Sequence, residues 1–213
     1  MTPAEQSLKA AEICRLAPVV PVIVVDDLAH ALPLARALVT GGLPALEVTL
    51  RTPVALDAIR AMAEVPGGVV GAGTLLTPAD VKAAKAAGAQ FGVSPGATDR
   101  LLDACAEHDL PLLPGAATAS EIMALLEKGH SVQKFFPAEQ AGGAAYLKAI
   151  GAPLPQVMFC PTGGIGLKNA RDYLALGNIL CVGGSWVAPK DALAAGDWAR
   201  ITALATEAAA LRR

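Results

Sequence analysis

A lysine lies inside an otherwise apolar, strand-like segment. Lys134 follows Val132 and Gln133 and precedes Phe135 and Phe136. Burying an ammonium group costs several kcal/mol, so a fold retains one only when it is paired, neutralised or useful. Burial also lowers the pKa of a lysine and frees its lone pair, as an imine-forming nucleophile requires. The alternative is a lysine at a strand end whose ammonium reaches solvent.

A second strand-like segment, 45–50, carries a polar face that could complement such a lysine. Alternation of side chains places Glu47, Thr49 and Arg51 on one face of this strand. A carboxylate beside a buried lysine can act as a general acid and base. An arginine there can bind a carboxylate or phosphate of the substrate. The alternative is a structural ion pair between Glu47 and Arg51.

Two glycine-rich turns follow the last two strand-like segments. One is Thr162-Gly163-Gly164 and the other is Gly184-Ser185. Glycine lets the backbone approach an anion closely, and exposed N–H groups at such turns stabilise it. Each turn alone could be an ordinary tight turn. Their paired placement predicts a phosphate site.

Eight strand-then-helix units follow one another along the chain, which predicts parallel βαβ units. We expect a compact (β/α)₈ TIM barrel with an extra N-terminal helix, formed by one domain spanning residues 1–213; a doubly wound open sheet is the alternative. The strands are expected at 19–25, 45–50, 69–74, 91–94, 111–115, 131–136, 156–161 and 179–183. The helices are expected at 3–16, 28–39, 53–63, 78–87, 98–107, 118–128, 143–150, 167–176 and 190–211.

The composition argues against several classes of function. The net charge is -2 and aromatic residues are 4% of the chain, so a basic, stacking surface for nucleic acid is not expected. No zinc-type spacing joins the four cysteines, which predicts reduced, buried thiols and no metal site. Every apolar run is interrupted, and the N-terminus does not resemble a signal peptide, so we expect a cytoplasmic protein without a membrane segment. The three histidines, His30, His108 and His130, are expected to be solvated.

Several segments together resemble the family of 2-keto-3-deoxy-6-phosphogluconate (KDPG) and 4-hydroxy-2-oxoglutarate (KHG) aldolases. The resemblance covers roughly residues 17–189, and its motifs occur in order. The matching segments are Gly42–Thr52, Val70–Thr74, Gly92–Gly96, Lys134–Glu139 with Gly142-Gly143, and Pro161–Ile165.

The resemblance implies a class I aldolase, a lyase without cofactor or metal, that acts on a small-molecule substrate as a homotrimer. By position, Lys134 resembles the imine-forming lysine and Glu47 the general acid/base. Arg51 and Thr74 resemble the binders of the pyruvyl carboxylate. The remaining matches are the substrate-pocket residues Pro95, Phe136 and Thr162, and the phosphate cradle of Gly163, Gly164, Gly184 and Ser185.

Three other functions remain open at this point. One is an aldolase for the galactonate epimer of KDPG, although a hydroxyl at Thr162 favours the gluconate series. Another is a sugar-phosphate isomerase or epimerase on the same phosphate site, which would not need a strand lysine. The third is a non-catalytic phosphate-binding trimer, which would leave Lys134 and Glu47 unexplained. Gln133 departs from the apolar residue expected before the lysine, and alternation places it on the outward face of its strand.

Overall fold

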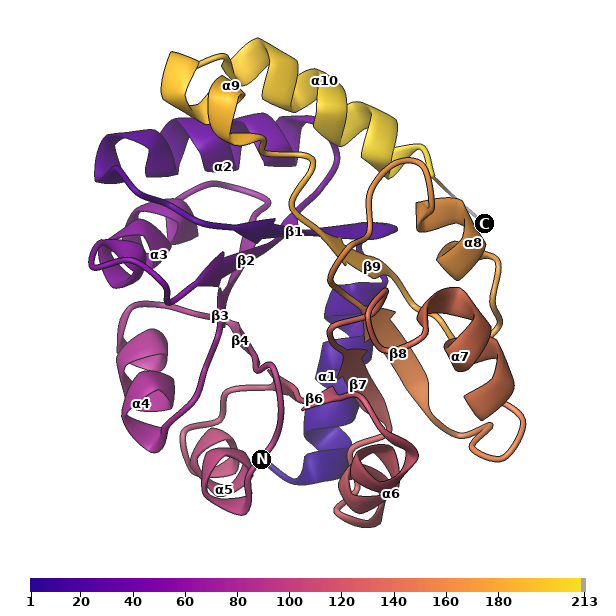
Figure 1. Ribbon diagram of the computed structural model, residues 1–213. Helices are drawn as coiled ribbons and strands as arrows, with labels where there is room; N and C mark the ends of the chain where they lie inside the picture. Colours follow the sequence, from indigo (N-terminus) through magenta and orange to yellow (C-terminus); the bar gives the residue numbers. More distant parts are fainter. Residues whose placement is uncertain (212–213) are drawn as a thin grey trace.

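The computed structural model describes residues 1–211, in which strands and helices alternate and every paired strand runs parallel to its neighbour (Figure 1). The strands fall where the sequence predicts them, mostly one or two residues shorter. They are β1 (Val19–Ile23), β2 (Ala45–Thr49), β3 (Val69–Gly73), β4 (Phe91–Val93), β5 (Leu112–Leu113), β6 (Gly115–Ala116), β7 (Val132–Phe135), β8 (Met158–Pro161) and β9 (Val182–Gly184).

The strands form a curled parallel sheet in two parts. Six strands pair in the order β5-β4-β3-β2-β1-β9, and three pair as β6-β7-β8. The fifth predicted strand is interrupted at Pro114, which has no N–H to donate to a ladder. Single bridges, Phe159 with Ile179 and Thr162 with Gly183, join β8 to the segment around β9. The carboxyl ends of all these strands therefore face one common region, since parallel strands share their direction.

Except for the N-terminal helix, which packs inside the curl, helices surround the curled sheet on its outer side (Figure 1). Thr77 and Thr118 begin two of them with capping boxes, in which Asp80 and Glu121 accept a hydrogen bond from the backbone of the cap residue. The helices are α1 (Pro3–Cys14), the 3-10 turn η1 (Leu28–His30), α2 (Ala31–Thr40), α3 (Ala55–Ala63), α4 (Pro78–Ala86), α5 (Asp99–Glu107), α6 (Ala119–Glu127), α7 (Gly143–Ile150), α8 (Ala170–Leu174), α9 (Lys190–Ala195) and α10 (Trp198–Ala209).

The prediction of one long final helix, 190–211, is wrong. Gly196 adopts a φ of 63°, a left-handed conformation that ends α9. Asp197 then accepts a hydrogen bond from the backbone N–H of Arg200 at 3.0 Å and begins α10, as an N-cap residue does. Helix α10 packs against both α2 and α9, and the two last helices lie over α2 in Figure 1.

Two apolar layers hold the fold together. The larger lies between the sheet and the outer helices and includes Phe135 and Phe159, whose rings meet edge to face at 6.4 Å. The smaller lies inside the curl of the sheet. There, the buried face of α1, with Ala10 and Cys14, packs against inward-facing strand residues such as Val132. Helix α1 thereby covers the inner residues on the side away from the carboxyl ends.

Two polar residues near β7 are buried. Gln133 points outward from the strand, as expected, and its side-chain amide donates to the carbonyls of Ile122 and His130 at 3.1 and 2.9 Å. His130 is only 1% exposed, so the expectation that it is solvated is wrong. His130 lies in the turn between α6 and β7, and burial lowers the pKa of its imidazole because the charged form loses its hydration. No helix of the described residues is long and apolar enough to cross a membrane.

Candidate active site

The centre of the site is a buried contact between a lysine and a glutamate from different strands. Lys134 of β7 donates to Oε1 of Glu47 of β2 at 3.2 Å, and the two residues are only 4% and 3% exposed. The two residues are 87 positions apart in the sequence. They meet because both side chains face inward at the same level of the curled sheet. The Nζ atom also lies 5.3 Å from the ring centroid of Phe136. An apolar ring on one side and a carboxylate on the other are the surroundings of a reactive lysine.

A glycine in the neighbouring strand creates the space for the glutamate. Gly73 pairs with Thr49 in the parallel ladder, and a Cβ on it would overlap Oε1 of Glu47. Any side chain at this position would therefore displace the carboxylate from Lys134. The sequence analysis did not assign Gly73 a role, although it ends β3 directly before Thr74. The position of this glycine, opposite the polar face of β2, could have predicted its role in making space for Glu47.

Arg51 and Thr74 lie together at the carboxyl ends of β2 and β3. The guanidinium Nε of Arg51 donates to the hydroxyl of Thr74 at 3.2 Å, which leaves both terminal nitrogens for a ligand. Thr74 has a φ of 62°, which is unfavourable for a β-branched residue. Such strain persists where the surrounding structure requires it, often at binding sites. Thr74 is thus placed to hold the guanidinium in one orientation.

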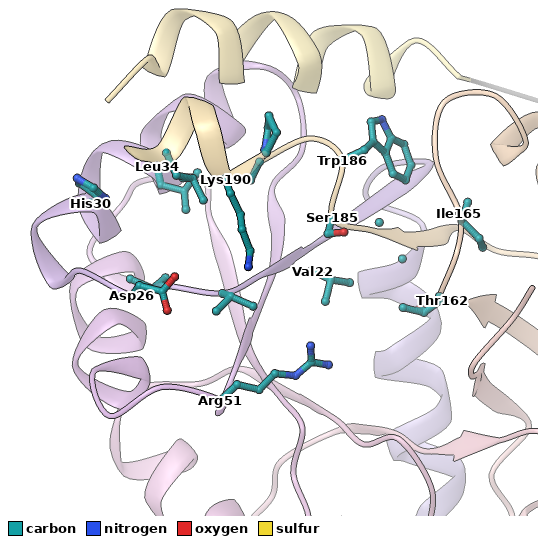
Figure 2. A pocket seen from close by; sticks show the side chains of 18 of the residues that line it. Val22, Asp26, His30, Leu34, Arg51, Thr162, Ile165, Ser185, Trp186 and Lys190 are labelled. Atoms are coloured by element: carbon teal, nitrogen blue, oxygen red, sulfur yellow. The ribbon is translucent and has the colours of Figure 1, made fainter. Parts of the chain in front are cut away.

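A cavity of about 790 Å³ opens above the lysine at the carboxyl ends of the strands. Figure 2 shows Arg51 entering it from one side, with Thr162 and Ser185 on the walls. Of the eleven residues predicted for the site, the cavity gathers Arg51, Lys134, Phe136, Thr162, Gly163, Gly164, Gly184 and Ser185. Glu47 lies beneath the cavity and accepts a hydrogen bond from Lys134. Thr74 accepts a hydrogen bond from Arg51, which lines the cavity. Pro95 lines an adjoining cavity of about 380 Å³, and Phe136 borders both.

The glycine-rich turn after β8 has the properties of an anion cradle. Gly163 and Gly164 adopt φ values of 107° and 74°, which residues other than glycine rarely accept. Within residues 1–211, the backbone N–H groups of these two glycines make no hydrogen bond to the protein. Gly184 and Ser185 lie across the same cavity, at the end of β9. The arrangement leaves donors available to a phosphate between the two turns.

Two buried hydroxyls, those of Ser94 and Thr162, have no hydrogen-bond partner among the described residues, and the second lies at the cavity wall. Thr162 Oγ1 is buried at the cavity wall and makes no hydrogen bond within residues 1–211. An unsatisfied buried hydroxyl costs about 1–3 kcal/mol, so a ligand that supplies a partner would recover that cost. The wall of the cavity thus contains a hydroxyl whose hydrogen-bonding capacity is not used within residues 1–211.

Four polar residues of the cavity were missed by the sequence analysis. Asp26, Asp27 and His30 follow β1, and Lys190 begins α9. In Figure 2 the side chain of Lys190 points into the cavity. Their positions in the sequence could have predicted this. The polar residues come directly after the first strand and the lysine shortly after the last one, and loops at these positions meet at the same end of the sheet. His30, which the sequence predicts to be solvated, is half-buried and lines this cavity.

The site suits carbonyl chemistry. A lysine that is held in an apolar environment beside a carboxylate can attack a ketone, while the carboxylate moves the protons that the addition and dehydration require. Arg51 and the glycine turns line the same cavity as that lysine, and both kinds of group can bind anions. By fold and geometry, the protein is thus of the class of α/β enzymes that act on anionic carbonyl compounds through an imine.

Comparison with known proteins gives the family. The family model for KDPG and KHG aldolases matches residues 10–204, so the chain belongs to this aldolase family. It is 57% identical over 200 residues to the KHG/KDPG aldolase of Escherichia coli K12, covering 93% of this chain and 94% of the relative.

Two solved structures resemble the fold. The Legionella pneumophila KDPG aldolase, with pyruvate captured as a covalent carbinolamine intermediate, is 48% identical with a TM-score of 0.91, covering 93% of this chain and 97% of that one. The native KDPGal structure is more distant, at 26% identity and a TM-score of 0.81, covering 91% of this chain and 93% of the other.

Proposed function

We propose that the chain is a class I aldolase that cleaves KDPG to pyruvate and glyceraldehyde 3-phosphate and also accepts 4-hydroxy-2-oxoglutarate. The buried contact between Lys134 and Glu47 at 3.2 Å, beneath the cavity of about 790 Å³, carries the proposal. The family and the carbinolamine formed by the Legionella enzyme support an imine mechanism.

In this mechanism Lys134 attacks the C2 ketone of KDPG with a neutral amine. Glu47, through a water molecule, transfers the protons that convert the carbinolamine into the imine. The protonated imine accepts the electron pair of the C3–C4 bond when the C4 hydroxyl loses its proton, with Glu47 as the base. Glyceraldehyde 3-phosphate leaves, the enamine is protonated at C3, and hydrolysis releases pyruvate. The covalent route divides one difficult step into several easier ones.

The remaining residues bind and orient the substrate. Arg51, held by Thr74, is assigned to the pyruvyl carboxylate, and Thr162 to a substrate hydroxyl. Phe136 and Pro95 are assigned to the walls of the pocket. The phosphate is assigned to Gly163, Gly164, Gly184 and Ser185. Binding of a phosphate far from the reacting carbons positions those carbons for the reaction.

The gluconate series is favoured over its galactonate epimer. The chain is 57% and 48% identical to the two KDPG aldolases above and 26% identical to the KDPGal structure. The unpartnered hydroxyl of Thr162 gives the site a polar group that can sense one configuration of a substrate hydroxyl. A comparison of kcat/KM for KDPG and its galactonate epimer tests this assignment.

A closed eight-stranded barrel, a single domain, a homotrimer and a cytoplasmic location complete the proposal. The two bridges between β8 and the segment around β9 support closure of the sheet. Apolar side chains on the surface, including Leu8, Leu76 and Met123, are 67%, 58% and 49% exposed. The exposure of these apolar side chains supports a subunit interface that would bury them. Light scattering after size exclusion should give a mass near three chains.

Ser185→Ala should weaken binding of the phosphorylated substrate selectively. A hydrogen bond to a charged group contributes about 1.5–3 kcal/mol, so KM for KDPG should rise by roughly 10–100-fold. KM for 4-hydroxy-2-oxoglutarate, which has no phosphate, should change by less than about twofold on the same argument. Steady-state kinetics with both substrates provides the measurement, and Ser120→Ala, an exposed residue of α6, is the matched control. Equal increases for both substrates would place the phosphate elsewhere.

Trapping with pyruvate and borohydride tests the central proposal. Two lysines line the cavity, Lys134 and Lys190, so the experiment must distinguish them. We expect one reduced pyruvyl adduct per chain by intact mass, located on Lys134 by peptide mapping. Because Glu47 contacts Lys134, Lys190→Met should leave the yield unchanged. An adduct on Lys190, or adducts scattered over exposed lysines, would rule out the assigned mechanism.

A further inference from the structure

Three of the four cysteines converge inside the curl of the sheet, away from the open cavity. Cys14 comes from α1, Cys160 from β8, and Cys181 directly precedes β9. All three are free thiols, each at most 2% exposed, and their sulfur atoms all lie within 4.8 Å of one another. The fourth, Cys105 of α5, is buried elsewhere. The sequence spacing gave no sign of this cluster, because its members come from elements far apart in the chain.

The sulfur separations suit a metal ion with three sulfur ligands. With metal–sulfur bonds of about 2.3 Å, a trigonal site places its sulfurs about 4 Å apart. Small rotations of the three side chains would therefore bring the sulfurs to a shared ion. Sulfur is the only ligand type in this group within residues 1–211, and thiolates select soft ions such as Cu(I) over hard ones.

We propose that Cys14, Cys160 and Cys181 form a binding site for one soft, thiophilic, monovalent metal ion of the Cu(I) type. The site is separate from the proposed aldolase chemistry and does not depend on it. When one Cu(I) binds, two of the thiols lose their protons and become thiolates, and the third coordinates as a neutral thiol. Two protons are released, and the complex carries one net negative charge. No oxidation or reduction is involved.

The surroundings can accommodate that charge. Lys134 is the ladder partner of Cys160, so its ammonium lies across the strand pair from the cluster.

A small internal cavity and one helix provide a route for the ion. The cavity, of about 10 Å³, is lined by Cys14, Cys160 and Glu47 among others. Helix α1 covers it and is attached by few side-chain hydrogen bonds, including those of Ser7 with Gly129 at 3.3 Å and Ser131 at 3.0 Å. Local opening of a terminal helix requires less free energy than global unfolding. Opening of α1 would expose Cys14 and the cluster behind it.

Titration of the full chain with Cu(I) under anaerobic conditions, supplied from a competing chelator, tests the site. We expect one ion per chain by native mass spectrometry. Cys14→Ala, Cys160→Ala and Cys181→Ala should each weaken binding by at least tenfold, whereas Cys105→Ala, the matched control, should bind as the unmodified chain does. Uptake that persists in the three variants, or that falls equally in the control, would overturn the proposal.

A second measurement on the unmodified chain avoids reliance on variants that could fold poorly. X-ray absorption should show three sulfurs at about 2.3 Å around the ion. An ion that binds the native state should raise Tm by roughly 5–10 °C at a hundredfold excess over Kd. Fewer than three sulfurs, nitrogen or oxygen ligands, or a lower Tm, which would indicate binding to unfolded thiols, would each contradict a native three-cysteine site.

Discussion

Lys134→Met should reduce kcat for KDPG cleavage by about 10⁴-fold or more, because removal of a covalent nucleophile eliminates the whole route. Methionine approximates the length of the lysine stem and fits the apolar side of the site near Phe136. The variant should also yield no reduced adduct with pyruvate and borohydride. Steady-state kinetics and intact mass on the same preparation provide both measurements.

A loss of activity must be separated from a loss of folding in this variant. Removing Lys134 leaves the buried carboxylate of Glu47 without its cation, and breaking a buried pair costs about 3–5 kcal/mol. Adding Glu47→Gln to the variant should recover much of that stability and none of the activity. Lys168→Met, at an exposed lysine, should retain both. Cleavage retained by folded Lys134→Met would remove the imine from the mechanism.

Much of the candidate site could be predicted because it depends on alternation within short strands. Lys134 and Glu47 each stand out as an inward charge in an otherwise apolar strand, and parallel strands bring such residues to one end of the sheet. Their contact at 3.2 Å agrees with that prediction. The glycine turns after β8 and β9 were predictable for the same reason, since both follow strand ends. The local sequence pattern was therefore sufficient to predict those site residues that a strand positions.

The rest depended on contacts between segments that no local pattern records. Gly73 matters because its neighbour across the ladder is Thr49, beside Glu47, which follows from register rather than from its own sequence context. Cys160 and Cys181 lie on bridged neighbouring segments, and Cys14 joins them because α1 packs inside the sheet. His130 is buried by tertiary packing although it follows a helix. The glycine before an aspartate at 196–197 is a signal for a helix break, but the helical periodicity on both sides of it predicted one continuous helix.

Glu47→Gln should reduce kcat by about 10²–10⁴-fold, the usual contribution of general acid–base catalysis. Glutamine keeps the shape of the side chain, and its amide oxygen can still accept a hydrogen bond from Lys134. The space opposite Gly73 fits either side chain. Imine formation should therefore continue slowly, so that pyruvate and borohydride still modify Lys134 after long incubation. Loss of rate with retained trapping would distinguish proton transfer from nucleophilic attack.

The same variant separates proton transfer from mere support of the lysine. If Glu47 only held Lys134 in place, glutamine would preserve most of kcat, because the hydrogen bond remains. If Glu47 moves protons at C2 and C4, the amide cannot replace it, and the exchange of C3 protons of pyruvate into solvent should slow together with cleavage. Glu207→Gln, at an exposed glutamate of α10, serves as the matched control and should leave both rates unchanged. An unchanged kcat in Glu47→Gln would assign the acid/base role to another group or to water.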